Sequence, residues 1–252
     1  MRAELSKKLL KTVGRTNGEF ELIGEGDKIC LALSGGKDSL TLAHILKEMQ
    51  RRAPFTFEFI AVTVSYGMGE DLSQLQEHCA RYEIPYKIYE TQIFEIAQDH
   101  IRENSSFCSF FSRMRRGALY TMAKELGCNK LALGHHLDDM AESFFMNILY
   151  NGSMRALAPK YRADNGIIVI RPLIKVRERV LRYHAQINNF PVIGDEACPS
   201  MKFSVKMPYA RAKTKELLAR LEAEHSNLFR MLATAFAHIH DDTFFEKERF
   251  KL

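Results

Sequence analysis

A glycine pair followed by a lysine is the part of this 252-residue chain whose residue types most clearly could do chemistry. Glycines let backbone N–H groups approach a phosphate, a following helix adds its positive N-terminal dipole, and a lysine adds a full charge. The segment therefore predicts an anion-binding loop with Lys37 as a catalytic candidate. A tight turn in which Asp38 or Ser39 only caps the next helix is the alternative. The predicted loop begins at the end of the apolar stretch KICLAL and consists of Leu33, Ser34, Gly35, Gly36, Lys37, Asp38 and Ser39.

A second polar cluster, GHHLDD from Gly134 to Asp139, follows the short apolar stretch KLAL. Carboxylates at the carboxyl end of a strand can hold Mg²⁺ through oxygen, and histidines can contact phosphate or move protons. In a doubly wound sheet this cluster and the glycine loop meet at one edge. The sequence thus predicts a metal, a nucleotide and a reacting group at that edge. A capping box between Asp139 and Glu142 is the structural alternative.

The five cysteines are an odd number, have no regular spacing, and occur in a chain large enough to fold without disulfides. We therefore expect cytosolic thiols. Cys30, Cys79 and Cys128 fall in or next to predicted strands and helices, where packing is the expected role. Cys108 and Cys198 fall in predicted loops, and the arginines after Cys108 favour a reactive thiolate, with packing as the alternative.

Positive charge is concentrated in parts of the chain. The formal net charge is +5, yet the segment from Gly152 to Tyr183 alone holds eight basic and two acidic residues. Such concentration is typical of a protein that binds a polyanion, because contacts with phosphates release counterions. Ordinary solvated helix faces are the alternative. The candidate RNA contacts are Arg113, Arg115, Arg116, Arg155, Lys160 and Arg171.

The elements that must position these residues follow from hydrophobic periodicity. Strands are predicted at 28–33, 57–64, 86–89, 130–133 and 167–170, and helices at 40–49, 72–82, 93–101, 113–126 and 140–150. Their alternation predicts an α/β fold with a doubly wound, mostly parallel sheet. After residue 175 the pattern is helical, with helices near 210–224 and 227–240. We divide the chain into an N-terminal helix (1–25), an α/β nucleotide-binding domain (26–175) and a helical C-terminal region (176–252).

The composition excludes several classes of protein. With 46% hydrophobic and 27% charged residues, the chain is neither disordered nor fibrous. No apolar run approaches the roughly 18 residues of a membrane span, and the N-terminus is too charged for a signal peptide. We expect a soluble, cytoplasmic protein without a membrane partner.

The SGGKDS run after an apolar strand resembles the loop of the PP-loop (ATP pyrophosphatase) family, whose members adenylate a carbonyl oxygen and release pyrophosphate. Within that family the chain is most similar to the tRNA 2-thiocytidine synthetases, through CSFFSRMRRGALY, GHHLDDMAESFFMNILY and IVIRPLIKVRE. The resemblance covers nearly the whole chain. It implies the adenine nucleotide alpha hydrolase type of fold, ATP and Mg²⁺ as cofactors and tRNA as the substrate. It also implies that Asp38 and Asp139 hold Mg²⁺, that Asp139 is catalytic, and that Gly134, His135 and the glycine loop bind the nucleotide.

The chain departs from this family at one cysteine. The thiolases that it resembles carry CxxC at the start of the arginine-rich helix and a third cysteine in a later loop, which together bind a 4Fe-4S cluster. Here Cys108 and Cys198 match the first and third cysteines, but Phe111 stands at the second. Two thiolates fall short of the usual ligand set. We therefore expect Cys108 and Cys198 to lie close together as a catalytic pair that carries persulfide sulfur. An incomplete cluster, or a cluster completed by another ligand, remains the alternative.

Three functions are compatible with these features. The first is an ATP-dependent tRNA thiolase that adenylates an anticodon-loop cytidine, inserts sulfur and releases AMP and pyrophosphate. The second is another PP-loop tRNA modifier, lysidine-synthase-like or amidating, and the third is a basic RNA-binding protein with a vestigial ATP loop. The intact SGGKDS and GHHLDD segments oppose the third function, and the retained Cys198 favours the first over the second. The expected partners are tRNA, a sulfur donor such as a cysteine desulfurase, and a second copy of the chain.

Overall fold

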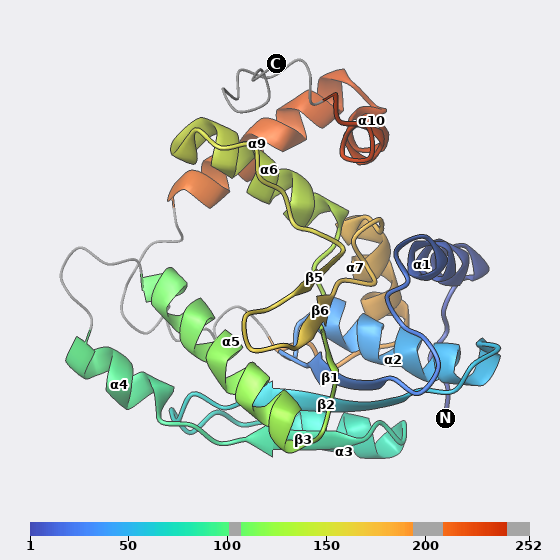
Figure 1. Cartoon of the computed structure of the whole chain (residues 1–252), viewed down its shortest axis with the longest axis vertical. Helices are drawn as coiled ribbons and strands as arrows, with labels where there is room; N and C mark the ends of the chain where they lie inside the picture. The colour runs from blue at the N-terminus through green and yellow to red at the C-terminus, as the bar shows by residue number, and fades with distance from the viewer. Residues whose placement is uncertain (101–106, 194–208, 241–252) are drawn as a thin grey trace, which may run out of the picture.

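A six-stranded sheet forms the centre of the molecule (Figure 1). The computed structural model describes residues 1–100, 107–193 and 209–240. The strands are β1 (Lys28–Ala32), β2 (Glu58–Val64), β3 (Tyr86–Tyr89), β4 (Lys130–Ala132), β5 (Lys160–Arg162) and β6 (Ile168–Ile170). Their order is β3-β2-β1-β4-β6-β5, and every pair is parallel except β5 with β6. The predicted doubly wound, mostly parallel sheet is confirmed.

Alternate residues of the strands supply two separate hydrophobic cores, because successive side chains of a strand point to opposite faces. Ile29 and Leu31 of β1 join a core with residues of α1 (Lys7–Phe20), α2 (Lys37–Arg52), α3 (Ser73–Arg81) and α7 (Glu178–Ile187). Cys30 joins the core on the other face, with α4 (Ile93–His100) and α5 (Phe107–Glu125). Figure 1 shows α5 and α2 on opposite sides of the sheet. Both faces are therefore covered by helices, as the pattern predicts.

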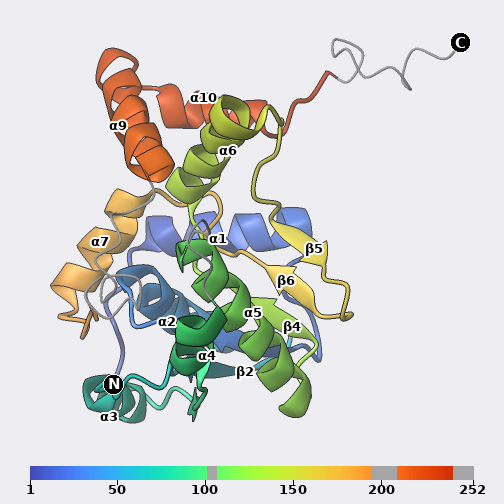
Figure 2. The same cartoon turned by 90° about the vertical axis from the view of Figure 1, so that its left-hand side faces the viewer.

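A third cluster lies above the sheet, where α6 (Leu137–Asn151) packs against α9 (Tyr209–Glu224) and α10 (Leu228–Ala235) (Figure 2). It includes Leu137 and Met140 of α6, Leu218 of α9 and Phe229 of α10. The predicted helical C-terminal extension is therefore present. Its first helix, α7, packs in the same core as α1 and α2, so this core extends across the predicted borders at residues 25 and 175.

The structure differs from the prediction in several places. The short strand β5 was missed, because its sequence KYR has exposed residues at both ends and no apolar run. Helix α2 begins at Lys37 rather than at residue 40, since Gly36 has extended angles and serves as its N-cap. Helix α5 begins at Phe107 rather than at Arg113, so Cys108 and Phe111 belong to a helix and not to a loop.

The two polar segments do meet at one edge of the sheet. After β1 the chain continues to β2 and β3 on one side, and later fills β4 and β6 on the other. The crevice between β1 and β4 is thus the switch point at which ligands bind in open α/β sheets. The glycine loop follows β1, and GHHLDD follows β4.

Candidate nucleotide site

The glycine loop is shaped by its own hydroxyl groups. The Ser39 hydroxyl donates to the Gly36 carbonyl at 2.9 Å and accepts from the Ser34 N–H at 3.2 Å. Gly35 has a φ of 79°, a left-handed conformation that favours glycine. A Cβ atom at Gly35 would lie 2.6 Å from Cδ1 of Ile193. Conformation and space therefore both require glycine at this turn.

Helix α2 starts from this loop without a side-chain cap among the described residues. Gly36 is the N-cap, and the helix proper begins at Lys37. The alternative interpretation, a turn in which Asp38 or Ser39 caps the helix, is therefore wrong. An uncapped N-terminus leaves its dipole and N–H groups for a ligand, and such an end suits a phosphate.

Lys37 lies at this helix start between two carboxylates. Its Nζ atom is 3.1 Å from Oδ2 of Asp38 and 3.0 Å from Oε1 of Glu178. Burial alone would lower the pKa of Lys37, but the two carboxylates outweigh it and raise the pKa. Burial would likewise raise the pKa of Glu178, yet the contact with Lys37 holds it at about 2. Lys37 and Glu178 are therefore charged near neutral pH, and Lys37 carries a full positive charge at the loop.

Asp38 has one carboxylate oxygen that fits a cation. Its Oδ1 atom is buried and has no hydrogen-bond partner in the described part of the chain. Burial raises the pKa of Asp38, while His136 and Lys37 partly offset this effect. A buried acceptor without a partner is costly, and a bound cation would satisfy it.

The described residues include no group of three His, Cys, Asp or Glu side chains arranged around a metal. Mg²⁺ is commonly held by one or two carboxylates together with substrate phosphates and water. Asp38 and Asp139 therefore fit a Mg²⁺ ion that reaches the site with a nucleotide, although they do not form a protein-only metal centre.

The N-terminus of α6 is capped by its own side chains. The Asp139 N–H donates to Nδ1 of His136 at 3.3 Å, and the His136 N–H donates to Oδ2 of Asp139 at 3.0 Å. A capping box is thus present, but it joins Asp139 to His136 and not to Glu142, so the structural alternative was wrong in its partner. Glu142 instead binds Arg211 of α9, which also contacts Oδ1 of Asp139 at 2.8 Å. Asp139 combines a capping role with a charge at the sheet edge.

Asp138, the neighbour of Asp139, is held by hydrogen bonds from the start of α7. It accepts hydrogen bonds from Nε of Arg177 at 3.1 Å and from the Glu178 N–H at 2.7 Å. Arg177 also forms two hydrogen bonds with Glu222 of α9, at 2.7 and 2.9 Å, and stacks on Phe229 of α10. The pair Asp138–Arg177 therefore ties the start of α6 to the C-terminal helices.

Gly134 lies against the glycine loop, and His135 next to it is bound by Arg171. A Cβ atom at Gly134 would lie 3.2 Å from the Ser39 backbone nitrogen, so the two loops are in close contact. The Nδ1 atom of His135 accepts a hydrogen bond from Nε of Arg171 at 3.2 Å. Burial, together with the charge of Arg171, lowers the pKa of His135 to about 4.

The predicted RNA contacts divide into exposed and buried residues. Arg171 is buried, with its guanidinium bound to His135 and to a backbone carbonyl, so its position does not favour contact with a phosphate. The other five candidates are exposed, on α5, after α6 and on β5: Arg113, Arg115, Arg116, Arg155 and Lys160. Two of them, Arg115 and Arg116, lie close enough to His135 to lower its pKa. The arginine face of α5 is thus adjacent to the nucleotide edge.

Phe111 lies in the core where the family's second cysteine would stand. Its side chain is 4% exposed, and its ring packs edge-to-face against Tyr66 and Phe110, with centroids 6.0 and 5.9 Å away. Cys108 is the second residue of the same helix, but its side chain, all of Cys198 and the predicted contact between them lie outside the described residues. A buried benzyl group offers no electrons to iron, so this position does not fit a three-cysteine cluster.

The three remaining cysteines, Cys30, Cys79 and Cys128, are buried as predicted. Burial raises the pKa of the Cys30 and Cys79 thiols to about 12 and also raises the pKa of Cys128. These thiols are therefore protonated packing groups.

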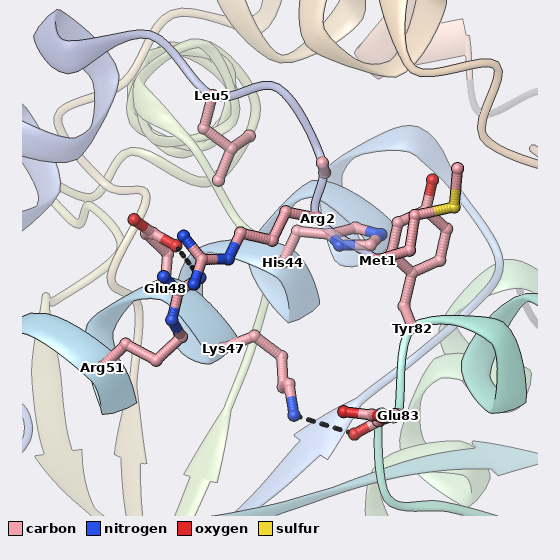
Figure 3. Close-up of a pocket in the computed structure, with 10 residues that line it drawn as sticks. Met1, Arg2, Leu5, His44, Lys47, Glu48, Arg51, Tyr82 and Glu83 are labelled. Atoms are coloured by element: carbon pink, nitrogen blue, oxygen red, sulfur yellow. Dashed lines mark hydrogen bonds and ion pairs between the residues drawn. The ribbon is translucent and has the colours of Figure 1, made fainter.

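A cavity of about 380 Å³ lies at the opposite end of α2 from the glycine loop (Figure 3). Lys47 and Arg51 of α2 line it together with Arg2 and Leu5 near the N-terminus and with Tyr82. Lys47 donates to the Glu83 carbonyl at 2.9 Å, and Arg51 pairs with Glu48. None of the predicted site residues lines this cavity.

The fold and the loop place the chain in a known class. The PP-loop domain family matches residues 3–207, and the chain belongs to this family. Its relatives include the tRNA-cytidine(32) 2-sulfurtransferase of Citrifermentans bemidjiense, 40% identical over 230 residues that cover 90% of this chain and 89% of the relative. The protein of the same name from Geobacter sulfurreducens is 41% identical, with coverages of 92% and 90%. The predicted resemblance is confirmed.

Solved structures agree with this placement. The U34-tRNA thiolase NcsA from Methanococcus maripaludis, with its [4Fe-4S] cluster, is similar with a TM-score of 0.74 at 26% identity, over 93% of this chain and 80% of that one. An NH3-dependent NAD synthetase from Campylobacter jejuni has a TM-score of 0.52 at 18% identity and shares the fold alone. No helix among the described residues is long and apolar enough to cross a membrane.

Several residues around the site were not predicted. Glu178, Arg177 and Arg211 contact predicted site residues, but they come from the C-terminal part of the chain. Arg177 and Glu178 end the stretch IVIRPLIKVRE, which carries the family resemblance but assigns them no role, and Arg211 lies in none of the stretches that carry it. Only the packing of α7 and α9 against α2 and α6 brings them together.

Proposed function

We propose that this chain is an ATP-dependent tRNA sulfurtransferase that adenylates the 2-oxygen of an anticodon-loop cytidine and replaces it with sulfur. One observation carries the proposal: the uncapped glycine loop with Lys37 and Asp38 shares one sheet edge with the acidic start of α6, beside the exposed arginines of α5. The names of its relatives support the same substrate.

Membership of the PP-loop family supports ATP binding. Different residues would then compensate the negative charge of the ATP phosphates. The start of α2 and Lys37 hold phosphate oxygens, because both are positive and the helix has no side-chain cap. Mg²⁺, held by Asp38 and Asp139, would neutralise further phosphate charge. The cytosine 2-oxygen attacks the α-phosphorus and pyrophosphate leaves. A sulfur nucleophile then adds to C2 and displaces AMP.

For the sulfur step we propose the thiols Cys108 and Cys198 and derive nothing from a cluster, because buried Phe111 replaces a ligand. A persulfide on one cysteine attacks C2 through its terminal sulfur and expels AMP. The second thiolate attacks the first cysteine's Sγ, which forms a Cys108–Cys198 disulfide and releases 2-thiocytidine as a thiolate. A dithiol reductant restores the pair of thiols.

We propose that a cysteine desulfurase supplies the persulfide sulfur and that the protein acts in the cytoplasm. A homodimer stays a prediction.

Incubation with tRNA, ATP, Mg²⁺ and a persulfide donor tests this function. Mass spectrometry of the digested tRNA should detect 2-thiocytidine, and chromatography should detect AMP and pyrophosphate in equal amounts. Formation of ADP, or absence of the thionucleoside, would contradict the function. Anaerobic treatment with iron and sulfide tests the sulfur step separately, since about four irons per chain would overturn the cysteine-pair mechanism and require a non-cysteine ligand.

A further inference from the structure

The hydrogen bond between Arg171 and His135 fixes where the histidine proton is. Nε of Arg171 lies 3.2 Å from Nδ1 of His135. A guanidinium has only donors, so Nδ1 must be the acceptor and cannot carry a proton. The ring proton of His135 is therefore on Nε2, and a doubly protonated ring would direct an N–H at another N–H.

The side chain of Arg171 is fixed in this orientation by burial and by two further contacts. It is 5% exposed, and its Nη1 atom donates to the Ala158 carbonyl. Its guanidinium lies over the Tyr161 ring, with Cζ 5.2 Å from the ring centroid, and the Tyr161 hydroxyl is 3.4 Å from that of Tyr120. This network orients the fork of Arg171 toward the histidine.

We propose that Arg171 is a positioning residue that holds His135 as the neutral Nε2–H tautomer, and that His135 donates this hydrogen to a phosphate oxygen of the bound nucleotide. The inference rests on the proposed function, which it deepens. It assigns His135 the role of a fixed donor and excludes it as the acid or base that moves a proton.

The surroundings of His135 agree with a neutral donor. The charges of Arg171 after β6 and of Arg115 and Arg116 of α5 oppose protonation of its ring, and that of Asp139 of α6 favours it. This excess of positive charge opposes protonation of the ring and attracts an anion. The contact between the adjacent Gly134 and the glycine loop brings His135 to the loop that is built for phosphate. The anion is therefore a phosphate of the nucleotide, rather than of the RNA.

The tautomer can be measured without any activity. In the ¹⁵N spectrum of histidine-labelled protein at pH 7.5, His135 should show a pyrrole-like Nε2 and a pyridine-like Nδ1. In Arg171→Met, which removes the donor to Nδ1, the signals of the two nitrogens should average. A wild-type ring with its proton on Nδ1, or on both nitrogens, overturns the inference. If the Arg171 variant fails to fold, the wild-type spectrum decides.

Two substitutions of His135 test the donor. A glutamine amide reaches about as far as Nε2 and an asparagine amide about as far as Nδ1, so only glutamine can replace the proposed donor. His135→Asn should weaken binding of an α,β-methylene ATP analogue about tenfold or more, and His135→Gln by about threefold or less. Equal losses contradict the inference. Failure of tRNA thiolation with the predicted spectrum and affinities would overturn the proposed function alone.

Discussion

Two helices start at the same edge of the sheet, and their N-termini are satisfied in opposite ways. α2 begins after a glycine pair with no side-chain cap among the described residues, whereas α6 begins with a capping box between His136 and Asp139. Every helix N-terminus has N–H groups without intrahelical partners and about half a positive charge. The open end of α2 is suited to an incoming anion. At the N-terminus of α6 the capping box already satisfies backbone N–H groups, and the first turn carries the carboxylates of Asp138 and Asp139.

The comparison shows how one edge can serve both an anion and a cation. In the proposed function, α2 and Lys37 would meet the phosphate charge, and Asp38 and Asp139 would meet the cation that accompanies it. The adjacent carboxylates of α6 also differ in their partners, because Asp138 accepts from Arg177 and the Glu178 N–H, whereas Asp139 accepts from the His136 N–H and from Arg211.

Removal of the lysine at the open helix end should have the largest effect. Lys37→Ala loses charge-assisted contacts to phosphate, each worth roughly 1.5 to 3 kcal/mol, and activity should fall about tenfold to a hundredfold. Lys47→Ala, at the other end of the same helix, is the matched control and should keep its activity. Steady-state thiolation rates measure both variants, with circular dichroism as the test of folding. Unchanged turnover in Lys37→Ala would reduce the glycine loop to a structural turn.

Substitutions of the two neighbouring aspartates of α6 should have different effects, one on stability and the other on activity. Asp138→Asn weakens the hydrogen bonds from Arg177 and Glu178 and should lower the free energy of unfolding by about 2 kcal/mol. Asp139→Asn should instead reduce activity and raise the Mg²⁺ concentration that is needed for half-maximal rate. Urea unfolding and Mg²⁺ titrations distinguish the two losses. The interpretation fails if Asp138→Asn changes the Mg²⁺ requirement and Asp139→Asn does not.

The arginine face of α5 should affect RNA and not ATP. If Arg115 and Arg116 contact phosphates, the logarithm of the tRNA affinity falls linearly with the logarithm of salt concentration. Arg116→Glu should weaken tRNA binding several-fold and reduce the slope by about 1. Lys124→Glu, exposed near the end of the same helix, is the control for net charge. Filter binding at several salt concentrations measures these slopes. A slope that does not change in Arg116→Glu would show that Arg116 makes no contact with tRNA phosphates.

The smallest effect is expected at His44 of α2, which lines the cavity in Figure 3 and shares a 2.9 Å hydrogen bond with His78. Burial lowers the pKa of His44 to about 3 and that of His78 to about 4. Both values lie below the unfolded value of about 6.5, so the unfolded chain binds more protons in acid. Stability is then complete above about pH 6.5 and is lost as the pH falls below it.

Urea unfolding should show a loss of about 1 kcal/mol or more between pH 6.5 and 5. His225→Gln, at an exposed histidine, should keep this slope, whereas the double variant His44→Gln with His78→Gln should flatten it. A wild-type stability that does not change over this range would contradict the buried neutral pair.

Much of this comparison could be predicted from the sequence, and the missing part has a physical reason. The strand runs KICLAL and KLAL, with polar residues directly after them, were sufficient to place both segments at one sheet edge. The start of α2 was placed too late, because Lys37 and Asp38 look like loop residues although the helix dipole favours an acid in the first turn. The contacts of Arg211 and Glu178 could not be predicted, since they depend on the packing of helices distant in sequence.

The adenylation of cytosine is the central claim, and one isotope measurement tests it directly. A synthetic tRNA with ¹⁸O at C2 of the target cytidine would be incubated with the protein, ATP, Mg²⁺ and a persulfide donor. If the 2-oxygen attacks the α-phosphorus, mass spectrometry will find the label in the AMP released with 2-thiocytidine. Label in pyrophosphate or in water, with unlabelled AMP, would contradict the account.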